Sequence, residues 1–140
     1  MNLLAKTISF LARLRYQLIY NWVNHPAAAQ LQVLQSLISD AQYTVFGKKY
    51  NFARIFTTKE FKERVPLSEY EDMKPYIDRM MKGEENVLWN TPITWFAKSS
   101  GTSNDKSKFI PVSEESLKEN HFKASKDVLT KYYQNFPSSD

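Results

Sequence analysis

The chain has 140 residues, of which 42% are hydrophobic; this is globular content for one domain or part of one and excludes an intrinsically disordered chain. It contains no cysteine, so disulfides and thiolate metal sites are excluded, and a cytoplasmic location is expected by default. The net charge of +4 is too small and too evenly spread along the chain to predict nucleic-acid binding.

Residues 1–23 predict an amphipathic helix, because apolar residues such as Leu11 and Leu18 recur there at steps of three and four. Lys6 and Arg13 interrupt the stretch, so it contains no apolar run of about 18 residues, and a membrane span is not expected. We favour a helix that packs on its own domain, with a helix lying on a membrane surface as the alternative.

A second helix is expected from about Ala27 to Ala41. Pro26 disfavours helical geometry at His25 and suits the first turn of a helix, so it should separate the two helices. The short link favours an antiparallel helical hairpin over residues 1–45, and His25 beside it should cap a helix or face solvent. The expected apolar face comprises Leu31, Leu34, Leu37, Ile38 and Ala41.

Gly47 is expected to close the section that contains the second helix, and the chain around it is rich in aromatic residues. They predict a small aromatic cluster under a loop, made of Tyr43, Phe46, Tyr50 and Phe52. Residues 53–92 are expected to be connecting structure with short helices. Thr58 should cap the first of these helices, and another should begin at Pro75 and end at Gly83. Between them, a capping-box pattern is formed by Ser68 and Glu71.

The segment from Lys98 to Lys108 has the composition of an anion-binding loop. Apolar runs at 93–97 and 109–112 flank it and predict a strand–loop–strand unit. Gly101 lets the backbone approach an anion closely, serine and threonine hydroxyls donate to phosphate oxygens, and Lys108 supplies a compact positive charge. The alternative is an ordinary solvated hairpin tip, since such tips have the same composition.

The order of residues in this loop resembles the first nucleotide-binding motif of the adenylate-forming enzymes. Ser-Ser-Gly-Thr-Ser is followed by five residues that end in Lys108 and then by Phe-Ile-Pro, which looks most like the acyl-acid amido synthetases, the auxin-responsive promoter family, in its bacterial type. Asp105 stands where that family often has a second glycine. The resemblance extends from the second helix to Pro111 and includes Val65-Pro66-Leu67, Tyr70-Glu71-Asp72 and Pro75-Tyr76-Ile77.

The resemblance implies a helix-rich α/β fold: an N-terminal fragment of an adenylate-forming enzyme, with a strand–phosphate loop–strand unit and a long C-terminal helix. Residues 1–140 would form a single piece of the large adenylating domain. ATP and Mg²⁺ are the implied cofactors, and a small carboxylic acid and an amine are the implied substrates. The acid attacks the α-phosphorus of ATP, and the amine then displaces AMP from the acyl-adenylate. The implied phosphate ligands are Ser99, Ser100, Gly101, Thr102, Ser103 and Lys108; no catalytic residue and no metal ligand is identified.

A long helix is expected over residues 114–136, because Ser113 is a good N-cap and two glutamates follow it. The apolar stripe predicted to face the core comprises Leu117, His121, Ala124, Val128, Tyr132 and Phe136. His121 should therefore be a buried or half-buried core histidine, with a ligand role as the less favoured alternative.

Members of the family are several times longer than this chain, so the resemblance implies either a fragment of a longer protein or a truncated relative, and we expect that these 140 residues cannot catalyse adenylation alone. We expect the isolated chain to associate with itself through apolar faces. The alternative class of function is a non-enzymatic helical module that docks on a protein or a membrane, with the loop as an incidental hairpin.

Overall fold

The computed structural model describes residues 3–99 and 107–136, which divide into two compact units. One unit contains the residues up to 29 and from 115 onward, and the other contains Gln30–Glu114; each is described by itself. The described residues are mostly helical, with one small antiparallel sheet, which confirms the helix-rich fold. That residues 1–140 form one piece of a larger domain stays a prediction.

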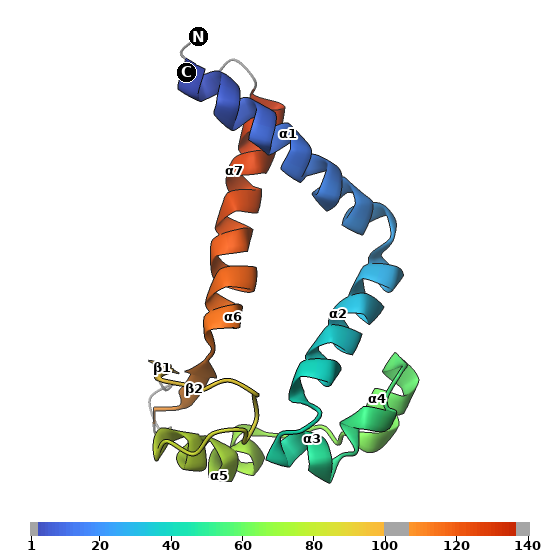
Figure 1. The fold of residues 1–140 in the computed structure, drawn as a ribbon, viewed down its shortest axis with the longest axis vertical. Coiled ribbons are helices and arrows are strands. Elements are labelled where there is room, and N and C mark those ends of the chain that lie inside the picture. The colour runs from blue at the N-terminus through green and yellow to red at the C-terminus, as the bar shows by residue number, and fades with distance from the viewer. Residues whose placement is uncertain (1–2, 100–106, 137–140) are drawn as a thin grey trace. The chain divides into compact units, whose positions relative to one another are not determined.

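The first unit is built on two helices, α1 (Leu3–Asn24) and α7 (Lys123–Asn135), which pack against each other (Figure 1). As expected, α1 stops just before Pro26, and α2 (Pro26–Ala41) begins there. His25 between them is exposed, in agreement with its position beside a turn. The packing of α1 against α2 as a helical hairpin stays a prediction. None of the described helices is long and apolar enough to cross a membrane.

The contact between α1 and α7 is polar. The Arg15 guanidinium donates two hydrogen bonds to the Asp127 carboxylate, of 2.6 and 2.9 Å. The Trp22 ring lies under the Arg15 guanidinium, 4.9 Å from the ring centroid, and under the Lys123 ammonium, 5.7 Å away. Thr130, one turn beyond Asp127, is buried. The inner face of α7 therefore carries charged and hydroxyl groups.

The apolar stripe predicted for the C-terminal helix is consequently wrong. Val128 is 70% exposed, Tyr132 is 48% exposed, and His121 is exposed rather than part of a core. The helix does run almost unbroken, as α6 (Glu114–Ser116), a π-helical stretch (Leu117–Phe122) and α7. A π-helical turn takes more residues than an α-helical turn, so residues on its two sides that are spaced by threes and fours do not share one face.

The second unit has its core where the end of α2 meets α3 (Val45–Lys49), the 3₁₀ turn Phe52–Arg54 and α4 (Thr58–Arg64). Of the face predicted for α2, the residues Ile38 and Ala41 are buried and Leu37 is exposed. The buried core residues here are Ile38, Ala41, Phe52 and Ile55.

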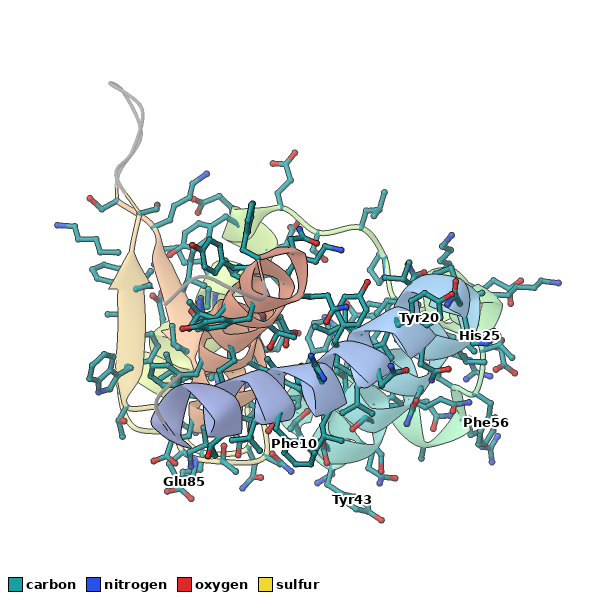
Figure 2. All side chains as sticks on the ribbon, turned by 90° about the horizontal axis from the view of Figure 1, so that it is seen from above. Phe10, Tyr20, His25, Tyr43, Phe56 and Glu85 are labelled. Atoms are coloured by element: carbon teal, nitrogen blue, oxygen red, sulfur yellow. The ribbon has the colours of Figure 1, made fainter. Side chains whose placement is uncertain are left out.

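The aromatic cluster is confirmed for three of its four predicted members. The Phe46 ring lies 4.7 Å from Tyr50 and 5.9 Å from Phe52, measured between centroids. The prediction is wrong for Tyr43, which is 72% exposed and whose side chain points away from the helices in Figure 2. Tyr43 lies in the turn before α3, so its side chain does not follow the spacing of the other three.

Thr44 and Gly47 hold α3 against the end of α2. The Thr44 hydroxyl accepts a hydrogen bond from the Gly47 N–H, of 3.0 Å, and donates one to the Ala41 carbonyl, of 2.7 Å. The prediction that Gly47 closes the section containing the second helix is wrong, because Gly47 lies buried inside α3. The first N–H groups of α3 donate to the carbonyls of Asn86 and Val87, which come from a distant segment.

The caps of α4 and α5 (Tyr70–Met81) lie one residue from their predicted positions. Thr57, not Thr58, caps α4, because its hydroxyl accepts a hydrogen bond from the Glu60 N–H. The Glu60 carboxylate in turn accepts hydrogen bonds from the Phe56 N–H and the Thr57 hydroxyl, which lower the pKa of Glu60. The Asp72 carboxylate accepts from the Glu69 N–H, of 2.9 Å, which replaces the capping box predicted for Ser68 and Glu71.

Pro75 lies inside α5 and does not begin it. The N–H group that proline lacks would have bonded the carbonyl of exposed Glu71, where water can take its place. The helix ends at Gly83 as predicted, because this glycine adopts a φ of 86°. The Gly83 N–H donates to the Met80 carbonyl, and the Glu84 N–H donates to the Arg79 carbonyl. These two bonds form the glycine-dependent helix end known as a Schellman motif.

Candidate functional site

The candidate loop is carried by a β-hairpin in the second unit. Strands β1 (Trp95–Lys98) and β2 (Phe109–Val112) pair antiparallel, with Lys98 opposite Phe109 at the end near the loop. The Ser99 N–H donates to the Lys108 carbonyl at 2.9 Å and extends this pairing by one residue on each side. The two predicted strands are therefore confirmed, with β1 beginning two residues later than the apolar run at 93–97, whereas residues 100–106 between them lie outside the described residues.

Two of the six predicted phosphate ligands fall on the described residues. Ser99 and Lys108 are both half-buried and lie opposite each other at the base of the hairpin loop. The hairpin register therefore brings together residues at the start and the end of the predicted motif. The other four predicted ligands lie outside the described residues: Ser100, Gly101, Thr102 and Ser103. The roles of all six residues stay predictions.

The hairpin does not stand alone, because β2 packs against α5. Tyr70, the first residue of α5, takes part in this contact. Its hydroxyl accepts a hydrogen bond from the Phe109 N–H, of 2.9 Å, and the Lys108 ammonium lies 5.5 Å from the centroid of its ring. Tyr70 thus contacts two consecutive residues at the point where the chain leaves the loop.

The geometry of an antiparallel pair explains why the Phe109 N–H needs this partner. Ser99 and Lys108 face each other as a hydrogen-bonded pair, so the next pair, Lys98 and Phe109, is of the non-hydrogen-bonded kind. The Phe109 N–H therefore points away from β1, toward the open edge of the sheet. Tyr70 satisfies this edge donor, which would otherwise have to find water.

Tyr70 is the site residue that the sequence reasoning missed. In the sequence, Tyr70 was noted only as part of the run Tyr70-Glu71-Asp72, which resembles the acyl-acid amido synthetases. Residue type was the only usable signal, because a buried tyrosine usually finds a hydrogen-bond partner for its hydroxyl, but only the structure shows that Tyr70 is half-buried. The identity of that partner could not be foreseen, since Phe109 lies 39 positions away.

The arrangement can supply hydrogen-bond donors and positive charge to an anion. The Lys108 ammonium and the Ser99 hydroxyl are donors that suit phosphate oxygens. They are not metal ligands of the kind that hard divalent cations prefer. Within residues 3–99 and 107–136, no group of three or more histidine, aspartate or glutamate side chains could hold a metal ion.

Comparison with known proteins gives consistent matches. The model of the GH3 family N-terminal domain matches residues 15–139. Indole-3-acetic acid-amido synthetase GH3.2 of Arabidopsis thaliana is 35% identical over 100 residues, which are 71% of this chain and 18% of the relative. The 4-substituted benzoates-glutamate ligase GH3.12 of Arabidopsis thaliana is 37% identical over 83 residues, which are 59% of this chain and 14% of the relative.

Solved structures agree with the sequence matches. A structure of the GH3.15 acyl acid amido synthetase matches with a TM-score of 0.74 at 28% identity, and covers 85% of this chain and 21% of that one. A second structure of that synthetase, in complex with 2,4-DB, matches with a TM-score of 0.66 at 26% identity and covers 88% of this chain. The chain therefore spans only 14–21% of the length of these two relatives and two solved chains.

Proposed function

Because the chain belongs to the GH3 family of acyl-acid amido synthetases, we propose that it is the N-terminal, ATP-phosphate-binding portion of an acyl-adenylate-forming ligase. The complete ligase activates a carboxylic acid with ATP and conjugates it to an amine or amino acid in the cytoplasm. The names of the two relatives support this reaction class, since one is an indole-3-acetic acid-amido synthetase and the other a benzoates-glutamate ligase.

The observation that carries the proposal is the register of the β1–β2 hairpin. It returns Lys108 to the base of the loop, opposite Ser99, so that an ammonium group and a hydroxyl group flank the predicted phosphate-binding segment. Charge builds up on phosphate oxygens when adenylate forms and pyrophosphate leaves. Donors placed in advance around those oxygens stabilise this charge.

In this proposal Mg²⁺ accompanies ATP and contributes neutralisation of the phosphate charge. Serine hydroxyl and lysine ammonium groups at the hairpin do not fit a protein-built magnesium cage, for which carboxylates are the usual ligands. The ion would thus be bound mainly through phosphate oxygens and water. We assign it no ligand in this chain.

The first test is ATP binding by the chain itself, followed through the amide NMR signals of Ser99 and Lys108 during titration with ATP and Mg²⁺. Lys108→Ala is expected to weaken binding by at least about tenfold, because a hydrogen bond to a charged group contributes about 1.5–3 kcal/mol and each 1.4 kcal/mol is about tenfold in affinity. Lys62→Ala is the matched control, since Lys62 is an exposed lysine of the same unit on α4.

The same samples should release no pyrophosphate when a carboxylic acid is added, since we propose that this chain does not catalyse adenylation alone. Turnover by the chain would contradict that part of the proposal. If ATP leaves the signals of Ser99 and Lys108 unchanged, the phosphate-binding role is wrong. A helical interaction module would then be the better interpretation.

Self-association is the second expected property of the isolated chain. On α1 the apolar residues Leu11, Leu14 and Leu18 are each more than half exposed, and on α7 Val128 and Leu129 are as well. Apolar surface of this kind favours contact between copies. Light scattering is expected to give a mass above that of the monomer, and Leu14→Gln with Leu18→Gln should lower it. Gln17→Ala, on the same helix, should not, and a monomeric wild-type chain would contradict the expectation.

A further inference from the structure

We propose that Tyr70 is a positioning residue for phosphate binding, which holds the Lys108 ammonium at the exit of the loop. The inference rests on the proposed function, in which Lys108 binds phosphate. Tyr70 reaches Lys108 from a different element, α5, and makes two separate interactions with the strand that follows the loop.

The first interaction restrains the backbone. The Tyr70 hydroxyl accepts the Phe109 N–H at 2.9 Å, and this donor lies directly after Lys108 on the edge of β2. A two-stranded hairpin is marginally stable by itself. Tying the edge of β2 to α5 therefore fixes where the Lys108 backbone lies. The helix is itself held in its unit by Ile77 and Met80, which are both buried.

The second interaction restrains the side chain. Lysine has a flexible four-carbon stem, and ordering it on ligand binding costs conformational entropy. The negative face of the Tyr70 ring attracts the Lys108 ammonium, which lies 5.5 Å from the ring centroid. Part of the ordering is thus complete before an anion arrives, and pre-ordering of this kind strengthens binding.

The ring does not hold the ammonium back from phosphate. A cation–π contact at a partly exposed site is weaker than a charge-assisted hydrogen bond to a phosphate oxygen. The Lys108 ammonium has three N–H donors, so it can stay over the ring and still donate to a phosphate oxygen. Tyr70 acts through Lys108 and need not touch the nucleotide.

The test is a double-mutant cycle on ATP affinity, measured by the NMR titration described above. Tyr70→Leu is expected to weaken ATP binding about threefold, and to have no further effect when Lys108→Ala is already present. Tyr70→Phe keeps the ring and should change affinity less than about twofold. In that variant, faster hydrogen exchange at the Phe109 amide should report the lost acceptor. Tyr43→Leu removes an exposed tyrosine of the same unit and serves as the matched control.

The outcomes separate the two proposals. If Lys108→Ala does not change ATP affinity, the proposed function fails and this inference fails with it. Suppose that Lys108→Ala weakens ATP binding. The positioning role alone is then overturned if Tyr70→Leu does not change ATP affinity, or if it lowers the affinity equally in the wild-type and Lys108→Ala backgrounds. Should Tyr70→Leu not fold, the ring-current shift of the Lys108 side-chain protons decides: its presence in wild type and in Tyr70→Phe supports the contact, and its absence overturns it.

Discussion

Gly47→Ala is expected to lower the free energy of unfolding by at least about 3 kcal/mol, at the upper end of the range for overpacked sites. A Cβ atom at this position would lie 2.0 Å from the Ala41 carbonyl oxygen, far inside van der Waals contact. The obstacle is backbone at the end of α2, so the clash cannot be relieved by turning a side chain. Alanine would otherwise stabilise the interior of a helix by up to about 1 kcal/mol relative to glycine. The steric cost of the added Cβ is larger than this gain, so the substitution lowers the free energy of unfolding.

Urea denaturation followed by circular dichroism is a suitable measurement, at a protein concentration low enough to limit association. Lys48→Ala is the matched control, because it places alanine at the next position of α3, where the side chain is exposed. That variant should stay within about 0.5 kcal/mol of wild type. A Gly47→Ala chain as stable as wild type would show that α2 and α3 do not approach each other as described.

Thr44→Val is expected to cost about 2–3 kcal/mol of unfolding free energy, although valine has nearly the same shape. Thr44 has an exposed fraction of 0%, and its hydroxyl both caps α3 and bonds the Ala41 carbonyl. Valine leaves the Gly47 N–H without its hydrogen-bond acceptor in a buried position. The loss therefore combines a helix cap with the desolvation of an unsatisfied donor.

Thr44→Ser separates the hydroxyl from the volume. Serine keeps both hydrogen bonds and loses one buried methyl group, so its cost should be about 1 kcal/mol, smaller than that of valine. The same urea titration compares the three proteins. A valine variant more stable than the serine variant would mean that packing around Thr44, and not its hydroxyl, holds α3 in place.

For the candidate site, the sequence predicted the two strands of the hairpin correctly but not the contact with α5 that supports them. Strand-forming runs on both sides of a polar segment indicate two strands and a loop without knowledge of the remaining fold. The register that pairs Ser99 with Lys108 agrees with that expectation. The contribution of Tyr70 did not follow from the sequence, because it depends on where α5 packs.

The structural features that the sequence determined by itself are those with a local cause. Proline at position 26 separates two helices because of its own backbone geometry, and Gly83 ends α5 because it can adopt a positive φ. The tertiary structure alone decided which faces are buried. Arg15 and Asp127 make a polar contact across 112 positions of chain, and the glycine of α3 meets a carbonyl of α2. Local backbone preferences act over a few residues, whereas burial depends on which distant segment packs against a helix, and a single helix does not encode its partner.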